Sequence, residues 1–155
     1  MKTTDAPLYS THLVNPFDVL TKAEKSLIYS AHNFMAFKKN QYLFRSGEPV
    51  KGIYCIKKDA VKVTQNHGQR TITLRFVSTG EWVGHRSIFT SDNYQGTAKA
   101  RLETQAYFIS ESLLLSLLIQ NKTFAYQFIK KIIKDLVAAE KKLFESQELN
   151  VPSRL

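Results

Sequence analysis

Residues 42–80 read YLFRSGEPVKGIYCIKKDAVKVTQNHGQRTITLRFVSTG, and this stretch decides the fold class. Short apolar or alternating runs are separated here by segments typical of turns: SGEP at 46–49, NHGQ at 66–69 and STG at 78–80. Ile72, Leu74 and Phe76 alternate with polar residues, so we expect them on one face of a half-buried strand. Similar short runs and turn segments continue from residue 34 to residue 110, and many short strands with regular turns predict an antiparallel barrel or jelly roll.

Helices are predicted on both sides of these strands. Thr21 and Glu24 have the spacing of a capping box, which predicts a short helix fading near residues 32–33. Ser110 is the predicted N-cap of a leucine-rich helix, and a longer helix follows from about residue 123 to residue 147.

The longer helix carries a narrow apolar seam. Its apolar residues recur at alternating three- and four-residue steps, which keeps one face toward a partner helix. The members of this seam are Ile129, Ile132, Ile133, Leu136, Ala139 and Leu143. We expect a homodimeric seam, because the helix offers more apolar surface than one small domain needs. Packing of the helix on its own roll is the alternative.

Composition indicates a globular protein. The 155 residues are 43% hydrophobic and 23% charged, enough for one packed domain. The net charge of +9 suits an anionic partner, but the basic residues are scattered, which favours a solvated surface over a DNA-binding face. No apolar run is long enough to cross a bilayer and no secretory leader is apparent, so a cytoplasmic protein without membrane contact is expected.

The sequence gives little support for a catalytic site or a metal site. His12, His32, His67 and His85 include no His-x-His pair, so no metal site is expected, and a haem ligand at His85 or His12 is the less favoured alternative. The single cysteine, Cys55, is predicted to be a core residue. The sequence shows no Ser/His/Asp order typical of a catalytic triad and no glycine-rich phosphate-binding loop. No catalytic residue is therefore assigned, and an enzyme is not expected.

The order of these segments resembles the sensor half of CRP/FNR transcription regulators, over roughly residues 17–155. Residues 42–48 and 52–63 are similar to a turn and a hairpin of that family, and residues 80–89 with Thr97-Ala98 are similar to its phosphate-binding cassette. The resemblance implies a mainly β fold with flanking helices: an antiparallel double-stranded β-helix (jelly roll) of the cyclic-nucleotide-binding type with a long C-terminal dimerisation helix. The implied divisions are an N-terminal arm (1–16), the roll with its short flanking helices (17–120), the dimerisation helix (121–148) and a hinge to a missing helix-turn-helix domain (149–155).

The resemblance also implies an effector site. A glycine at 84 would turn the chain into a short helix whose free amides face a phosphate, with the Thr97 hydroxyl as a further donor. The implied effector-binding residues are Gly84, His85, Arg86, Ser87, Thr97, Ala98 and Glu140.

The cassette departs from the family pattern at two positions. His85 stands where the family has a glutamate for the ribose, and Gly96 where it has an arginine for the cyclic phosphate. Cyclic AMP is therefore not the expected effector, and a different small anionic effector is the alternative. One or more basic side chains could then bind the negative charge of that effector. The candidates are Arg75, Arg86, Lys99 and Arg101, and the alternative is that these side chains simply face solvent.

The implied function is the effector-sensing and dimerising half of a DNA-binding regulator. DNA would be read by a domain after residue 155, so the chain is either a piece of a longer regulator or an unusually short member. An effector bound between the cassette and the long helix would favour one arrangement of the two helices of a dimer. Two alternatives are a ligand-independent dimerisation scaffold and a sensor module of a non-transcriptional protein.

Overall fold

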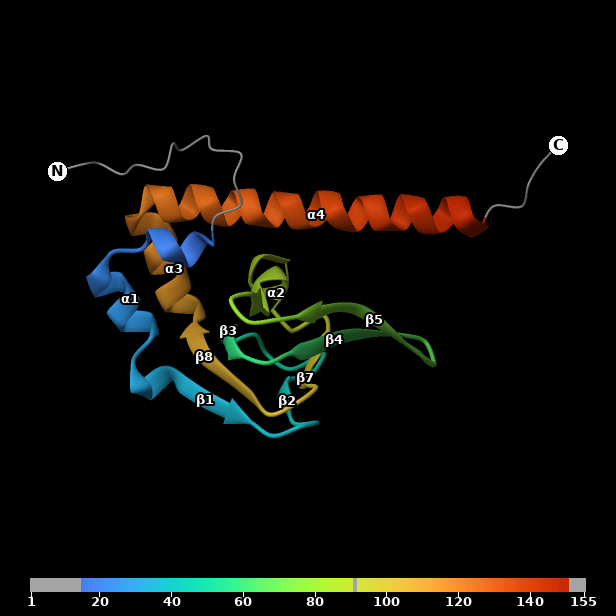
Figure 1. Ribbon diagram of the computed structural model, residues 1–155, viewed down its shortest axis with the longest axis horizontal. Helices are drawn as coiled ribbons and strands as arrows, with labels where there is room; N and C mark the ends of the chain where they lie inside the picture. Colours follow the sequence, from blue (N-terminus) through green and yellow to red (C-terminus); the bar gives the residue numbers. More distant parts are fainter. Residues whose placement is uncertain (1–14, 91, 151–155) are drawn as a thin grey trace. The chain divides into compact units, whose positions relative to one another are not determined.

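The computed structural model describes residues 15–90 and 92–150, with side chains as far as residue 147 (Figure 1). It contains two compact units: residues 21–120, and a second unit whose described part comprises residues 15–20 and 121–150. Of the predicted arm, residues 1–14 lie outside the described residues, and Pro16 already begins the 3-10 helix η1 (Pro16–Val19). Of the predicted hinge, residues 151–155 lie outside them as well.

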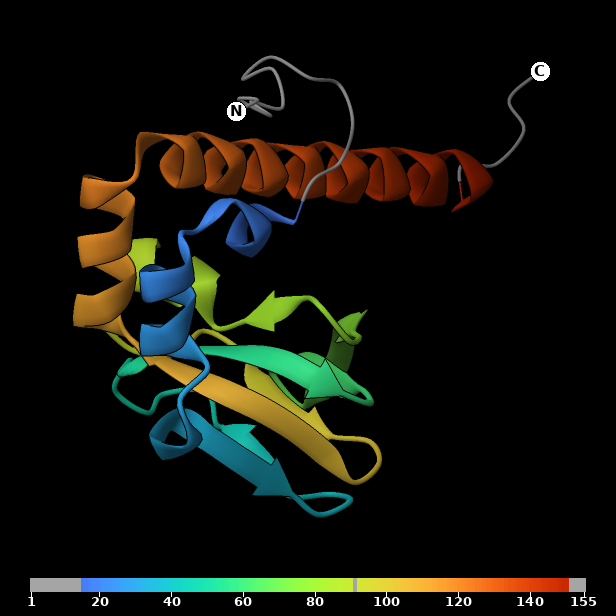
Figure 2. The same ribbon diagram turned by 60° about the vertical axis from the view of Figure 1, so that its left-hand side comes forward.

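The larger unit is a jelly roll, as the sequence predicts. The described strands form two antiparallel sheets of four (Figure 2). The first sheet has the order β1 (Phe34–Phe37), β8 (Thr104–Ser110), β3 (Gly52–Lys58), β6 (Trp82–Val83). The second has the order β2 (Tyr42–Phe44), β7 (Thr97–Ala100), β4 (Val61–His67), β5 (Arg70–Val77). Apolar side chains from both sheets form one buried cluster, which is the core of the roll.

A bulge in β5 overturns one prediction. Val63 on β4 pairs with Arg75, but the next residue, Thr64, pairs with Thr73, so Leu74 is an extra residue in β5. A one-residue insertion reverses the alternation of faces, and Ile72 and Phe76 therefore do not share a face. The prediction of a half-buried apolar face was also wrong, because all three apolar residues are largely exposed: Ile72 43%, Leu74 44% and Phe76 54%.

Helices α1 (Lys22–Ile28) and α3 (Glu111–Gln120) pack on the first sheet. Their contacts bury a second apolar set, formed by Ile28, Ile53, Ile109, Leu114 and Leu117. The predicted capping box of α1 and the predicted Ser110 cap of α3 are both present. The prediction that the first helix continues to residues 32–33 was wrong, since α1 ends at Ile28 and a separate 3-10 helix, η2 (Ala31–Asn33), follows.

Cys55 lies on the same side of β3 as Ile53, because residues two apart in a strand share a face. The cysteine is buried, as predicted, and burial raises the pKa of its thiol. The thiol is therefore protonated at neutral pH.

The second unit is built on the long helix α4 (Lys122–Asn150). Asn121 caps it, because its Oδ1 accepts a hydrogen bond from the Phe124 amide at 2.9 Å. The rings of Phe17 and Phe124 lie 5.2 Å apart and fasten η1 to the start of the helix. Farther along, the predicted seam residues Ile129, Ile133, Leu136 and Leu143 are 51–62% exposed on the single chain.

Candidate functional site

The predicted cassette turn is formed at Gly84. Its φ of +100° lies in the region that favours glycine, and the next residue begins the short helix α2 (His85–Thr90). A Cβ placed on Gly84 would lie 3.2 Å from the Gly52 carbonyl oxygen and 3.4 Å from a ring carbon of Tyr94. Glycine is thus required here both for its backbone conformation and for the close approach of β3.

Tyr94 anchors the segment that precedes β7. Its hydroxyl donates to the Gly52 carbonyl at 2.7 Å and accepts from the Lys51 and Gly52 amides, each at 3.4 Å. Its ring stacks on Phe44 with 3.9 Å between the centroids and 12° between the planes. Both side chains are buried, and both lie next to Gly84. Sequence reasoning missed them, although an aromatic residue within the polar segment SDNYQG was a usable signal.

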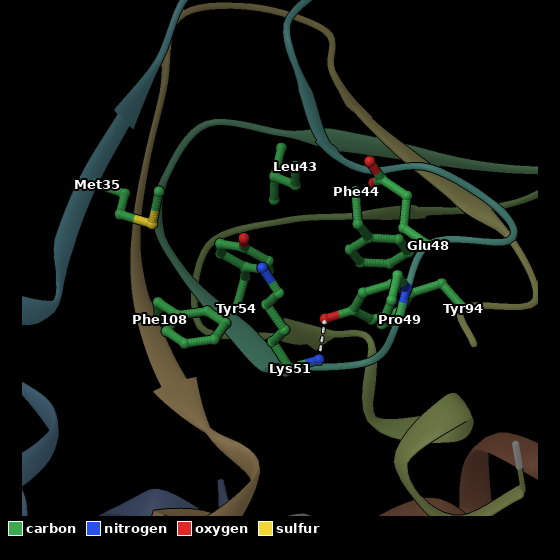
Figure 3. A pocket seen from close by; sticks show the side chains of 9 residues that line it. All are labelled: Met35, Leu43, Phe44, Glu48, Pro49, Lys51, Tyr54, Tyr94 and Phe108. Carbon is green, nitrogen blue, oxygen red and sulfur yellow. Dashed lines mark hydrogen bonds between the residues drawn. The ribbon is translucent and has the colours of Figure 1, made fainter. Parts of the chain in front are cut away.

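A cavity of about 360 Å³ opens beside this aromatic stack (Figure 3). Its apolar walls are Met35, Leu43, Phe44, Tyr54, Tyr94 and Phe108, and Glu48, Pro49 and Lys51 complete the lining. Leu43 and Phe44 both face inward, because a bulge in β2 pairs Tyr42 with Lys99 but Phe44 with Ala98. The cavity therefore combines aromatic rings, a thioether and aliphatic carbon.

The Tyr54 hydroxyl points into this cavity between Met35 and Phe44 (Figure 3). Burial raises the pKa of Tyr54 to about 12, with smaller contributions from Tyr94 and Glu48. Tyr54 is therefore a neutral hydrogen-bond donor at physiological pH. The Glu48 carboxylate and the Lys51 ammonium in the lining cancel in charge. The cavity therefore suits an uncharged planar molecule better than a cyclic phosphate.

Four of the predicted effector-binding residues are buried: Gly84, described above, and three that carry side chains. His85 is 2% exposed and meets the Trp82 ring edge-on at 5.7 Å. The Ser87 hydroxyl oxygen accepts from the Gln95 amide at 3.1 Å, and Ala98 belongs to the core of the roll. The side chains of His85, Ser87 and Ala98 therefore contact other residues of this chain.

Arg86 and Thr97 are not among the residues that line the cavity either. Arg86 is exposed on α2, and Glu140 is exposed on α4 in the second unit. The Thr97 hydroxyl oxygen accepts from the Ser46 amide at 3.0 Å. Of the seven predicted residues, none lines the cavity of Figure 3, although Gly84 is next to two that do.

Gly96 explains why an arginine is not accommodated in this cassette. A Cβ at this position would lie 2.9 Å from the Thr64 carbonyl oxygen, which is backbone of the neighbouring strand β4. Any side chain would therefore require the two strands to separate.

The remaining basic candidates have distinct surroundings. Arg75 is half-buried, and its Nη2 donates to the Trp82 carbonyl at 3.2 Å, which links β5 to β6. The Arg101 guanidinium lies 4.5 Å over the Phe76 ring, and the Lys99 ammonium 5.4 Å from the Tyr42 ring centroid. Among the described residues, no three His, Cys, Asp or Glu side chains gather as metal ligands.

The larger unit is thus a jelly roll in which a positive-φ glycine leads into a short helix and lies next to two residues that line a cavity. The chain belongs to the cyclic nucleotide-binding domain family, whose model matches residues 34–121. No helix in the described ranges has the length and apolarity needed to span a membrane.

Individual relatives support the same family assignment. The chain is 25% identical over 115 residues to the "Anaerobic regulatory protein" of Bacillus subtilis, covering 73% of this chain and 48% of that protein. The structure is similar to the sensor domain of the transcriptional regulator DNR from Pseudomonas aeruginosa, with a TM-score of 0.70, 19% identity and coverage of 96% and 93% of the two chains. It is equally similar to the catabolite activator protein of Thermus thermophilus, with a TM-score of 0.70, 19% identity and coverage of 86% and 63%. The resemblance to CRP/FNR regulators is thus confirmed, and the chain spans about half the length of the B. subtilis relative.

Proposed function

We propose that this chain is the effector-sensing and dimerising half of a cytoplasmic, DNA-binding transcription regulator. Its domain family and the regulatory names of its relatives support the sensing part of this proposal. DNA binding would belong to a further domain of the regulator, beyond residue 155. The role is regulatory rather than catalytic.

The cavity beside Tyr94 is the observation that carries the proposal. An effector held there would contact Phe44, Tyr54 and Phe108 and would accept a hydrogen bond from the Tyr54 hydroxyl. Phe44 and Tyr94 also lie against Gly84, so an occupant that moves either ring would act on the turn before α2. The effector class that fits is a planar, largely uncharged molecule.

A ligand screen on the chain tests this proposal. Thermal unfolding would be measured with cyclic mononucleotides, cyclic dinucleotides and a panel of uncharged aromatic compounds. We expect an aromatic compound to raise the unfolding temperature, and Met35→Trp, which places an indole at the cavity, to abolish that shift. Leu27→Trp is the control, because it adds the same ring to an exposed position of α1. Stabilisation by a cyclic nucleotide alone would contradict the proposed effector class.

Dimerisation through α4 is the second part of the proposal. Ile129, Ile133, Leu136 and Leu143 follow one another at steps of four, three and seven residues, which keeps them on one helix face. All four are exposed on the single chain, which suits a seam with a second copy. Ile132 is half-buried and Ala139 is exposed, so their place in such a seam remains a prediction.

One observation favours a second candidate, the ligand-independent scaffold. The stacked rings of Phe44 and Tyr94 fill the space directly beside Gly84, and the Tyr94 hydroxyl is fully engaged with backbone groups. A cassette held closed by its own side chains would need no effector. If no compound of the panel changes the unfolding temperature and the dimer persists without ligand, the scaffold is the better description.

A further inference from the structure

A row of cations and aromatic rings crosses the outer face of the second sheet. In the strand register, Tyr42 on β2 is opposite Lys99 on β7, Lys99 is opposite Lys62 on β4, and Lys62 is opposite Phe76 on β5. Their neighbours along the strands, such as Val61 and Ala98, face the core, so this row faces outward. A hollow lined by residues of this row shares no lining residue with the cavity of Figure 3.

Arginines extend the row at both ends. The Arg45 guanidinium carbon lies 4.2 Å over the Tyr42 ring, and that of Arg101 lies 4.5 Å over the Phe76 ring. These cation–π contacts hold the guanidinium groups on the sheet and cover the ring faces. Four cations are thus ordered along one line of a sheet.

The pairing of Lys62 with Lys99 is electrostatically unfavourable. Directly opposite side chains on one face of antiparallel strands lie about 5 Å apart, and like charges there destabilise a sheet. Both lysines are half-buried, and neither makes an ion pair with a carboxylate of the described residues. In the described part of the chain, the fold therefore brings these two positive charges together without a carboxylate partner.

The same residues line a hollow of about 550 Å³. Its cations are Arg45, Lys62 and Lys99, and the rest of its lining is uncharged, with hydroxyl groups from Ser46, Thr64, Thr71 and Thr97 among it. The Ser46 and Thr71 hydroxyls already donate to the Gln95 carbonyl and to Asn66 Oδ1. The three cations, with no carboxylate in the lining, are the complement of phosphate oxygens.

We infer that this hollow binds a small molecule carrying at least two phosphate groups. A single negative charge would leave the site strongly positive, whereas a diphosphate or triphosphate would neutralise the Lys62–Lys99 repulsion and engage Arg45. A small molecule fits better than a nucleic acid strand, because the exposed rings are already covered by cations and are not open platforms for stacked bases. The site is separate from the effector cavity and does not depend on the proposed function.

Titration calorimetry of the chain with inorganic tripolyphosphate, pyrophosphate and orthophosphate tests the inference. We expect affinity to rise with the number of phosphates. Lys62→Gln and Lys99→Gln should each weaken tripolyphosphate binding about tenfold, the loss of one charge-assisted hydrogen bond. The matched controls are Lys57→Gln and Lys58→Gln, which remove the same charge from exposed positions of the first sheet and should leave binding unchanged.

Folding is checked on the same variants without ligand. Lys62→Gln and Lys99→Gln should each unfold at a slightly higher temperature than the unmodified chain, because one of two repelling charges is gone. Equal losses of affinity in the site and control variants would overturn the inference, since they would indicate a general effect of net charge. It would also be overturned by a lower unfolding temperature in both site variants, or by a single-stranded oligonucleotide that binds more tightly than tripolyphosphate and displaces it.

Discussion

The Tyr94 hydroxyl donates a 2.7 Å hydrogen bond to the Gly52 carbonyl, across 42 residues of sequence. Gly52 has no room for a side chain, because a Cβ there would overlap the Ile109 carbonyl oxygen on β8. The first residue of β3 is therefore held between a neighbouring strand and a tyrosine from a distant loop. This contact positions both the wall of the cavity and the turn at Gly84.

Tyr94→Phe should destabilise the fold. The change leaves the ring stacked on Phe44 but removes the hydroxyl from the buried backbone groups of Gly52 and the part-buried amide of Lys51, at a cost of about 1–3 kcal/mol. Urea unfolding followed by circular dichroism measures the change. Tyr42→Phe, on an exposed ring, is the control and should stay within about 0.5 kcal/mol. Equal effects of the two changes would remove the special role of Tyr94.

Gly84→Ala and Gly47→Ala separate backbone strain from crowding. Both glycines have positive φ, +100° and +91°, so both alanines should cost roughly 1–2 kcal/mol. Only the Cβ at 84 meets neighbours, and overpacking should add about 1 kcal/mol there. Urea midpoints of the two variants give the comparison. A larger loss at Gly47, whose Cβ would be in open space, would contradict this account.

Gly96→Arg should not create a cyclic nucleotide site. The new Cβ would press on the Thr64 carbonyl of β4, so we expect a loss of about 1–3 kcal/mol in stability and no binding of cyclic AMP by calorimetry. Gln95→Arg adds the same group at an exposed neighbouring position and should leave stability unchanged. A stable Gly96→Arg variant that binds cyclic AMP would show that the strands separate readily.

Leu136→Asp should prevent dimerisation. In a homodimeric seam the carboxylate would be buried without a partner, which costs about 3–5 kcal/mol. Sedimentation velocity should show a dimer for the unmodified chain and a monomer for the variant. Ala138→Asp places the same charge on an exposed residue outside the seam and should leave the dimer intact. Identical sedimentation of all three proteins would exclude α4 as the interface.

Alkaline pH should destabilise the roll partly through Tyr54. Its pKa is raised from 10.0 to about 12 in the folded chain, so folding favours the neutral phenol. The resulting stabilisation is complete below the unfolded pKa of 10.0 and is lost as the pH rises through about 12. The free energy of unfolding should fall between about pH 10 and about pH 12 more steeply for the unmodified chain than for Tyr54→Phe. Parallel pH profiles would refute the contribution of Tyr54.

Local features of the fold could be predicted from sequence. The Thr21–Glu24 capping box, the Ser110 cap and the turn at Gly84 depend on residues within a few positions of one another, and all three are present. Asp59 has a φ of 72°, and aspartate is one of the residue types that tolerate a left-handed turn.

Features that depend on distant strands could not be predicted. The extra residue at Leu74 exists only relative to β4, and it changes which face each residue of β5 occupies. The aromatic residue in the polar segment around Tyr94 is a local signal, but its hydrogen-bond partner, the Gly52 carbonyl, lies 42 residues away and is not encoded locally. The family resemblance assigns Thr97 to an effector, but its register with Thr64 places it on the outer face of the sheet, where it lines the basic hollow.

The buried Cys55 makes this chain a convenient background for site-directed labelling. Its thiol is protonated and shielded, so maleimide reagents should spare it in the native protein and modify a cysteine introduced on the exposed surface of α4. A spin or fluorescent label at Ala138→Cys would then report distances between two copies of the helix. At a fixed concentration of thiol reagent, the slow rate at which Cys55 itself is modified would measure how often the roll opens.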